Sequence, residues 1–303
     1  MSPRAQWGAA ALEESHVIEP ERGLVGRDEV PLGTALSLPP GVIGIDAGMT
    51  LTKIARGTVE GILVVSHEAG TGPGRGDDYA HVAGAERIGV TGARVGDLAG
   101  LRPVRVQEID AAARGVVALL DAEDRLGAGE FVMVLLGTGT AFAAVRGETV
   151  SHLGGTPLGG GSFAGIARRI DATLSYTAMI ASAGRGDRRR VDAMISDVYP
   201  EGIGRVAPDL TAAHLAKTGG AIDDVLAGLL NLHGENIAQI GASRAIIANM
   251  RRIVVAGGFA HGNPSLVASM TSMAGLFGVS VEVTTAPGFA GAIGAALAAA
   301  VPP

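Results

Sequence analysis

The feature of this sequence that most restricts its fold is one pattern that occurs twice: a strand, a turn of small and hydroxyl residues, and a returning strand. Residues 42–45 predict a buried strand, residues 50–55 its antiparallel partner and residues 61–66 a third strand. Residues 131–136 and 141–146 repeat the arrangement around the turn GTGT. Two similar α/β lobes that face one another would bring both turns to a common cleft, which is the geometry that a nucleotide needs.

The remaining elements follow from apolar runs and helical spacing. Further strands are predicted at residues 88–91, 104–107, 252–256 and 280–284, and helices at residues 77–86, 110–122, 162–175, 222–250, 264–275 and 288–301. Residues 1–40 have no sustained period and contain several prolines and charges, which favours a partly disordered extension. We therefore expect an extension at residues 1–40, an N-terminal lobe at 41–123 and a C-terminal lobe at 124–303.

Composition excludes several classes of protein. Of the 303 residues, 47% are hydrophobic and 18% charged, which is typical of a globular protein. A net charge of −6 argues against a nucleic-acid partner. The absence of cysteine excludes disulfides and thiol chemistry and fits a reducing cytoplasm. The longest weakly polar run, at residues 290–301, is shorter than the ~20 residues that cross a bilayer. The sequence thus predicts a cytoplasmic protein without a membrane partner.

Both turns have the residue types that bind phosphate, because converging backbone N–H groups need neighbours without bulky side chains. The first turn contains Asp46 at the strand end, where a carboxylate suits a hydrated Mg²⁺, and Lys53 in the returning strand as a point charge for phosphates. The other candidates in the two turns are Gly48, Thr50, Thr52, Gly137, Thr138, Gly139 and Thr140. Either turn alone would fit an ordinary hairpin.

A third glycine-rich segment, GGTPLGGGSF at residues 154–163, precedes a predicted helix. The free N–H groups and the dipole of a helix start attract anions, and glycines permit a close approach. A flexible linker is the alternative, but the segment lies between strongly patterned elements. Gly257 and Gly258 follow the strand IVVA and could pass under an adenine or a ribose.

Glu108 lies where a predicted strand meets a predicted helix, which is a suitable place for a base that accepts a proton from an attacking hydroxyl. The alternative is a helix cap, although Asp110 has the shorter side chain that caps prefer. The seven histidines are scattered without HExxH spacing, so no histidine metal site is predicted.

Seven motifs occur in the order found in type II pantothenate kinases, and the sequence resembles that family over about residues 41–301. The motifs are GIDAGMTLTKIA, EIDAAARG, LLGTGTAF, HLGGTPLGGGSFAG, PDLTAAH, VVAGGF and GFAGAIGA. The resemblance implies a two-lobed actin-like ATPase fold with duplicated ribonuclease H-like lobes. It also implies an enzyme that uses ATP and Mg²⁺ to phosphorylate pantothenate, a small hydroxyl substrate.

The resemblance also implies roles for individual residues. Glu108 would be the catalytic base, and residues 46–55 would form the first phosphate loop with Lys53. Thr138 would touch nucleotide phosphate, and the long helix at residues 222–250 would form a homodimer. The residues implied to line the nucleotide site are Gly160, Gly161, Ser162, Phe163, Tyr176 and Gly258, and those of the substrate loop are His152, Gly154, Gly155 and Thr156.

Two positions depart from the family pattern. Met49 replaces a glycine, and His152 replaces an arginine that helps to hold pantothenate in the family. A histidine offers a shorter side chain without a bidentate charge, although His152 could also be an ordinary surface loop residue. Two alternatives to a pantothenate kinase therefore stay open: a kinase of a related hydroxyl compound, and a catalytically silent sensor of nucleotide or acyl-CoA.

Overall fold

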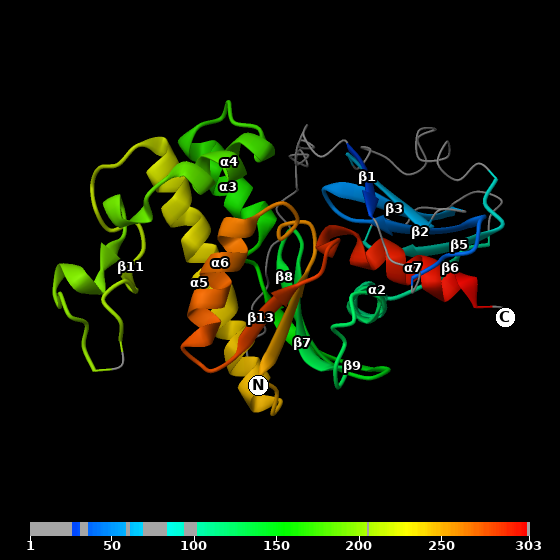
Figure 1. Cartoon of the computed structure of the whole chain (residues 1–303). Helices are drawn as coiled ribbons and strands as arrows, with labels where there is room; N and C mark the ends of the chain where they lie inside the picture. Colours follow the sequence, from blue (N-terminus) through cyan, green and yellow to red (C-terminus); the bar gives the residue numbers. More distant parts are fainter. Residues whose placement is uncertain are drawn as a thin grey trace, which may run out of the picture.

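The computed structural model describes residues 26–30, 36–58, 61–68, 84–93, 102–204 and 206–301, and its two large sheets form the two lobes of an actin-like fold (Figure 1). The first sheet has the order β1 (Gly26–Val30), β4 (Gly61–Glu68), β3 (Leu51–Thr58), β2 (Val42–Ala47), β5 (Arg87–Thr91), β6 (Val104–Arg105). The second sheet has the order β13 (Ser280–Val283), β12 (Arg252–Ala256), β7 (Glu130–Leu136), β8 (Thr140–Arg146), β9 (Thr149–Thr156). The predicted fold class is confirmed.

Both predicted strand–turn–strand units are present. β2 and β3 pair antiparallel, with Asp46 opposite Lys53, and β7 and β8 pair antiparallel on either side of the GTGT turn. Most of the helix predicted at residues 77–86 lies outside the described residues, and residues 84–86 are not helical. β1 lies within the predicted extension and pairs with β4, so that part of residues 1–40 belongs to the sheet.

The substrate loop that the resemblance implies at residues 152–156 is instead part of a strand, β9. A two-residue connection joins Arg146 to Thr149, and Gly147 has φ +56°, which suits the primed turns of tight hairpins. The glycines of this strand weaken its β pattern in the sequence, and the ladder to β8 supplies the hydrogen bonds that hold it extended. The glycine-rich loop is therefore limited to the residues between Thr156 and Gly160.

The helices agree with the predictions in place more than in length. They are α2 (Glu108–Ala122), α3 (Gly160–Ile170), α4 (Tyr176–Arg185), α5 (Ile222–Ile247), α6 (Pro264–Gly275) and α7 (Ala290–Ala300). The predicted helix at residues 162–175 is wrong at its end, because Asp171 accepts hydrogen bonds from Thr173 N and Oγ1 in a turn. Ser175 then caps α4 by accepting from Ala178 N.

A small projection lies beyond α5, away from the first sheet (Figure 1). It contains the paired strands β10 (Ala193–Met194) and β11 (Thr211–Ala213) and the short 3-10 helices η1 (Arg188–Arg190) and η2 (Ile195–Asp197). A third 3-10 helix, η3 (Pro287–Phe289), leads directly into α7.

The last helix does not stay with the second lobe. α7 packs along β2 and β5 of the first sheet and beside α2 (Figure 1). A division of the chain at residue 124 therefore does not describe α7, which follows the second sheet in sequence but covers the first. The sequence AGAIGAALAAA is apolar on every side, which is typical of a helix that is buried all round.

Glycine lets α7 approach its neighbours at backbone distance. A Cβ atom on Gly44 of β2 would lie 1.9 Å from Ala292 O, and one on Gly89 of β5 would lie 1.8 Å from Ala295 O. On α7 itself, a Cβ on Gly294 would lie 1.8 Å from Ala111 O of α2. These distances exclude any side chain at the three positions. The packing of α7 on the first sheet and on α2 therefore requires glycine there.

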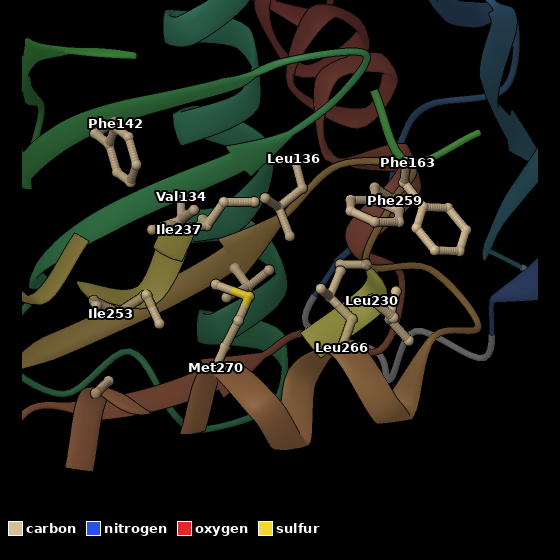
Figure 2. Packing of buried hydrophobic residues seen from close by; sticks show 14 of the residues in the cluster. Val134, Leu136, Phe142, Phe163, Leu230, Ile237, Ile253, Phe259, Leu266 and Met270 are labelled. Atoms are coloured by element: carbon tan, nitrogen blue, oxygen red, sulfur yellow. The ribbon is translucent and has the colours of Figure 1, made fainter. Parts of the chain in front are cut away.

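One apolar core joins the two lobes and a second lies under the other face of the second sheet. The first contains side chains of both sheets together with α2 and α7, including Val42, Ala55, Leu119, Phe131, Met133 and Ile293. The second lies between the second sheet and helices α3, α4, α5 and α6 (Figure 2), and includes Val134, Phe142, Phe163, Ile237, Phe259 and Met270. α2 and α7 thus lie between the sheets and connect them.

Most apolar residues of α5 are used within their own subunit. Leu226, Leu229, Leu230 and Ile237 are buried in the second core, whereas Ile247 is 86% exposed. The helix that the resemblance implies for a dimer therefore uses most of its apolar side chains within its own subunit, and the dimer stays a prediction. Within the described part of the chain, no helix is both long and apolar enough to cross a bilayer.

We expect Gly44→Ala to destabilise the protein by about 1–3 kcal/mol or more, because the added methyl overlaps the Ala292 carbonyl of α7. Gly275→Ala is the matched control, since a Cβ at that position meets nothing within 4 Å. Thermal unfolding of both variants measures the difference. Equal midpoints for the two variants would show that α7 does not need the backbone contact.

Candidate functional site

Asp46 and Lys53 form a largely buried ion pair at the end of the first strand–turn–strand unit. The two residues face each other in the β2–β3 ladder, and Lys53 Nζ lies 3.3 Å from Asp46 Oδ2. Asp46 also lies beside the first turn of α7, where a Cβ on Gly291 would be 2.9 Å from Asp46 Oδ2. The amino end of a helix favours a nearby negative charge, so α7 as well as Lys53 stabilises the carboxylate.

Lys53 reaches towards the second lobe. Its Nζ would be 3.9 Å from a Cβ on Gly258, in the segment that follows β12. The two turns also meet, because Thr50 Oγ1 of the first lies 3.4 Å from Thr138 Oγ1 of the second. The structure thus brings together the first turn, the GTGT turn and the Gly257–Gly258 segment, as the sequence predicts.

Glu108 is the first residue of α2, and its carboxyl belongs to the same electrostatic group. The Glu108 residue is exposed, but nearby protein atoms keep part of the water away from its carboxyl group, and this desolvation raises its pKa. The negative charge of Asp46 raises the pKa further, and the positive charge of Lys53 opposes both effects. The residue before the helix, Gln107, occupies the cap position without a side-chain hydrogen bond. The interpretation of Glu108 or Asp110 as the helix cap is therefore wrong, and the Glu108 carboxylate is not used for capping.

Two backbone amides at the start of α3 hold the GTGT turn. Gly160 N donates to Gly137 O at 2.9 Å, and Gly161 N donates to Thr138 O at 3.0 Å. A Cβ on Gly159 would lie 2.7 Å from Thr138 O. The expectation that the amides at this helix start are free for an anion is therefore wrong for Gly160 and Gly161, whose role is to support the turn.

The hydroxyl and glycine residues of the turns divide into internal and accessible groups. Thr140 is buried and donates to Leu158 O at 2.7 Å, and Gly48 N closes its own turn on Leu51 O. Thr52 is also buried. Gly137 and Thr138 are exposed, and Gly48, Thr50 and Gly139 are half-buried, so a ligand can reach these residues of the turns.

Two residues that the resemblance places at the nucleotide have their side chains in the core. Phe163 is fully buried and Tyr176, at the start of α4, is 9% exposed, and both belong to the second core. Their side chains are therefore part of the apolar core rather than of an accessible surface. Met49, which replaces a family glycine, is 52% exposed in the first turn.

The predicted substrate residues lie on β9, at the edge of the second sheet, rather than in a loop. His152 is exposed and pairs with Ala143, which faces the core around α2. Gly154 pairs with Phe142, which faces the opposite core. His152 is therefore on the sheet face of Glu108 and α2. Gly155 and Thr156 shape the strand end, where Thr156 Oγ1 accepts from Leu158 N.

Sequence reasoning missed two side chains of α5 that contact these segments. Arg244 donates to Leu153 O and lies beside Gly154, with its guanidinium 5.2 Å from the Phe142 ring centroid. His233 lies 2.9 Å from Ser162 Oγ. Single polar residues on an apolar helix face were the available signal, but their partners are far away in sequence.

Comparisons with known proteins show which proteins this chain is similar to. The family model described as Fumble matches residues 128–298, more than half of the chain. A type II pantothenate kinase of Oceanobacillus iheyensis is 30% identical over 267 residues, covering 84% of this chain and 98% of the relative. A type II pantothenate kinase of Staphylococcus epidermidis is 26% identical over 262 residues, covering 84% of this chain and 98% of the relative.

Solved structures are similar in fold. One is the activator of the 2-hydroxyisocaproyl-CoA dehydratase from Clostridium difficile with bound ADPNP, at a TM-score of 0.57 and 19% identity, covering 86% of this chain and 94% of that one. Another is a ROK family glucokinase from Streptomyces griseus with glucose and AMPPNP, at a TM-score of 0.52 and 18% identity, covering 85% and 98%. These likenesses support the two-lobed fold.

The charges around Glu108 predict opposite titration shifts for two variants. Asp46→Asn removes the negative charge that raises the pKa of Glu108, so the pKa falls, whereas Lys53→Met removes the opposing positive charge, so the pKa rises. Carbon-13 NMR titration of the Glu108 carboxyl, assigned with Glu108→Gln, measures both shifts. Asp110→Asn is the control and leaves the pKa near its wild-type value. A shift of the same sign in the Asp46 and Lys53 variants would contradict the arrangement.

Proposed function

Because this chain belongs to the type II pantothenate kinase family, we propose that it transfers the γ-phosphoryl group of ATP to the primary hydroxyl of pantothenate. The product is 4′-phosphopantothenate, and the reaction is the first step of coenzyme A biosynthesis. The observation that carries the proposal is the meeting of the two hydroxyl-bearing turns at Thr50 and Thr138, next to the Asp46–Lys53 pair and the Glu108 carboxyl with its raised pKa.

Glu108 acts as the general base in this proposal. Its carboxylate accepts the proton of the pantothenate hydroxyl while the oxygen attacks the γ-phosphorus and the bond to the ADP oxygen breaks. The raised pKa supports the role, since a carboxylate of higher pKa is a better proton acceptor at neutral pH. Lys53, which lies between the lobes, stabilises the phosphate charge, and Thr50 and Thr138 orient the phosphates from the two turns.

Mg²⁺ fits the residues of the site through water rather than through a protein cage. Among the described residues, no group of three or more acidic or histidine side chains could hold a metal directly. Asp46 would hold the hydrated ion, and its proximity to Glu108 gives the region the negative charge that a divalent cation relieves. When bound with ATP, the ion neutralises charge on the transferring phosphates.

We expect Glu108→Gln to lower kcat by roughly 10²–10⁴-fold, because the amide cannot accept the hydroxyl proton. ATP affinity stays close to the wild-type value. Asp110→Asn removes an exposed carboxylate two residues further along α2 and serves as the charge-matched control. A coupled ADP-release assay with pantothenate measures turnover. Glu108→Gln turnover within a few-fold of the control would remove the base assignment, and ATP binding without any turnover by the wild type would favour the silent sensor.

The pantothenate carboxylate needs a partner, and we propose that His152 provides it with one hydrogen bond. An arginine would supply a charged fork, and a charge-assisted bond contributes about 1.5–3 kcal/mol. His152→Arg is therefore expected to lower the KM for pantothenate by about ten- to a hundredfold. Ser151→Arg adds the same charge on the opposite face of β9, where Ser151 pairs with Ala144. Steady-state kinetics measure the KM for pantothenate of both variants. Equal KM values would contradict the contact between His152 and the pantothenate carboxylate.

The same assay separates the acceptors. If neither His152→Arg nor the wild type phosphorylates pantothenate while both turn over ATP with a related alcohol, the kinase chemistry stands and the acceptor differs. Screening pantothenate and pantetheine side by side gives this answer directly.

We also propose that the protein forms a homodimer through the outer face of α5. The exposed or half-exposed residues of that face recur at helical spacing: Leu232, Asn236, Gln239, Ser243 and Ile247. Ile247→Asp is expected to shift the protein from dimer to monomer at micromolar concentration in sedimentation velocity, because it places a charge in the contact. Leu276→Asp, on a different exposed surface, is the control. A wild-type monomer would contradict the proposal.

A further inference from the structure

His233 of α5 is a buried histidine to which the proposed reaction gives no role. Its side chain is 0% exposed. It contacts Ser162, which follows Gly160 and Gly161, and Phe259, which follows Gly257 and Gly258. Nδ1 is 2.9 Å from Leu229 O, and Nε2 is 2.9 Å from Ser162 Oγ. The rings of Phe163 and Phe259 meet the imidazole edge-on, at centroid distances of 5.9 Å and 6.1 Å.

The partners of the imidazole determine where its proton lies. A carbonyl oxygen only accepts, so Nδ1 carries the hydrogen that is donated to Leu229 O. Burial lowers the pKa of His233, which keeps the ring neutral and leaves Nε2 as an acceptor. The Ser162 hydroxyl has two acceptors within reach, His233 Nε2 at 2.9 Å and Gly159 O at 3.1 Å. Gly159 O already accepts from Phe163 N at 3.0 Å, whereas the buried Nε2 has only this donor, so the hydroxyl proton goes to Nε2.

The direction of this hydrogen bond determines which other hydrogen bond the Ser162 hydroxyl can make at the start of α3. A hydroxyl has one proton, so donation to His233 leaves the oxygen lone pairs to accept from Gly159 N at 3.0 Å. Gly159 in turn packs on the GTGT turn, where its Cβ would lie 2.8 Å from Gly139 Cα. A continuous set of contacts thus runs from His233 through Ser162 and Gly159 to the phosphate turn.

We propose that His233 is a positioning residue that holds the glycine loop against the GTGT turn and thereby sets the affinity of the site for ATP. The proposal rests on the proposed function, since it takes this turn as part of the nucleotide site. Phe259 extends the effect to a second segment, because it follows Gly258 and packs on both the imidazole and Phe163. α5, which is also the proposed dimer helix, therefore supports both glycine segments through one side chain.

Replacements of His233 can separate this role from simple packing. His233→Met keeps an apolar side chain of similar length and removes the acceptor for Ser162. His233→Gln restores an acceptor near the position of Nε2. Ile237→Val, one turn further along α5, removes a buried methylene without touching the loop and is the control for core destabilisation.

The measurement is calorimetric binding of ATP with Mg²⁺ to the full-length protein without pantothenate, alongside thermal unfolding. We expect His233→Met to weaken ATP binding by about three- to tenfold, the loss typical of one neutral hydrogen bond. His233→Gln recovers most of the affinity. Ser162→Ala weakens binding at least as much, because it also removes the hydrogen bond from Gly159 N, and the double variant with His233→Met is no weaker than Ser162→Ala alone. Ile237→Val lowers the unfolding midpoint and leaves ATP affinity unchanged.

Several results would overturn the proposal. Unchanged ATP affinity in His233→Met would show that the imidazole is only a core side chain, and additive losses in the double variant would show that the two residues act independently. If His233→Met does not fold, Ser162→Ala with wild-type affinity gives the same negative answer. Failure of the proposed function is distinguishable, because a wild type that binds ATP but does not phosphorylate pantothenate leaves the His233 measurements intact.

Discussion

The backbone contact between α7 and the first sheet is the constraint on which the rest of the structure depends. Gly44 and Gly89 admit α7 at a distance that no side chain permits, and Gly294 admits α2 in the same way. α7 therefore fixes the sheet and α2 relative to each other with little freedom. Because the core around α2 and α7 also contains side chains of the second sheet, the same contact relates the two lobes.

This packing also arranges the charges of the site. The first turn of α7 lies against Asp46, and α2, which packs on α7, carries Glu108 at its first position. Two carboxyl groups are thereby brought close enough for Asp46 to raise the pKa of Glu108, while Lys53 keeps the pair from being purely repulsive. A carboxyl group of raised pKa thus results from helix packing that glycines define.

The second lobe supports its turn differently. The amides of Gly160 and Gly161 at the start of α3 donate to carbonyls of the GTGT turn, so these glycines hold the shape of the turn. Ser162 and His233 continue the support into the apolar core. The two halves of the site therefore differ in origin: an ion pair held in a strand ladder on one side, and a turn held by a loop and a buried histidine on the other.

Local patterns in the sequence determined most strands of the two large sheets, both hairpins around the turns and the long helix, because these depend on spacing within a few residues. They also placed Asp46 at the end of one strand and Lys53 in the returning strand, and the ladder of the folded sheet then pairs the two residues. Only the tertiary structure decided that α7 returns to the first lobe, that residues 149–156 form a strand and that His233 contacts Ser162. The return of α7 depends on the backbone of β2, and the His233 contact depends on the hydroxyl of an α3 residue 71 positions away. β9 depends on its ladder to the neighbouring strand β8, because its own glycines weaken the strand pattern in the sequence. Local propensity contains no information about such partners. The sequence around a glycine or a single histidine does not show whether another backbone packs on it.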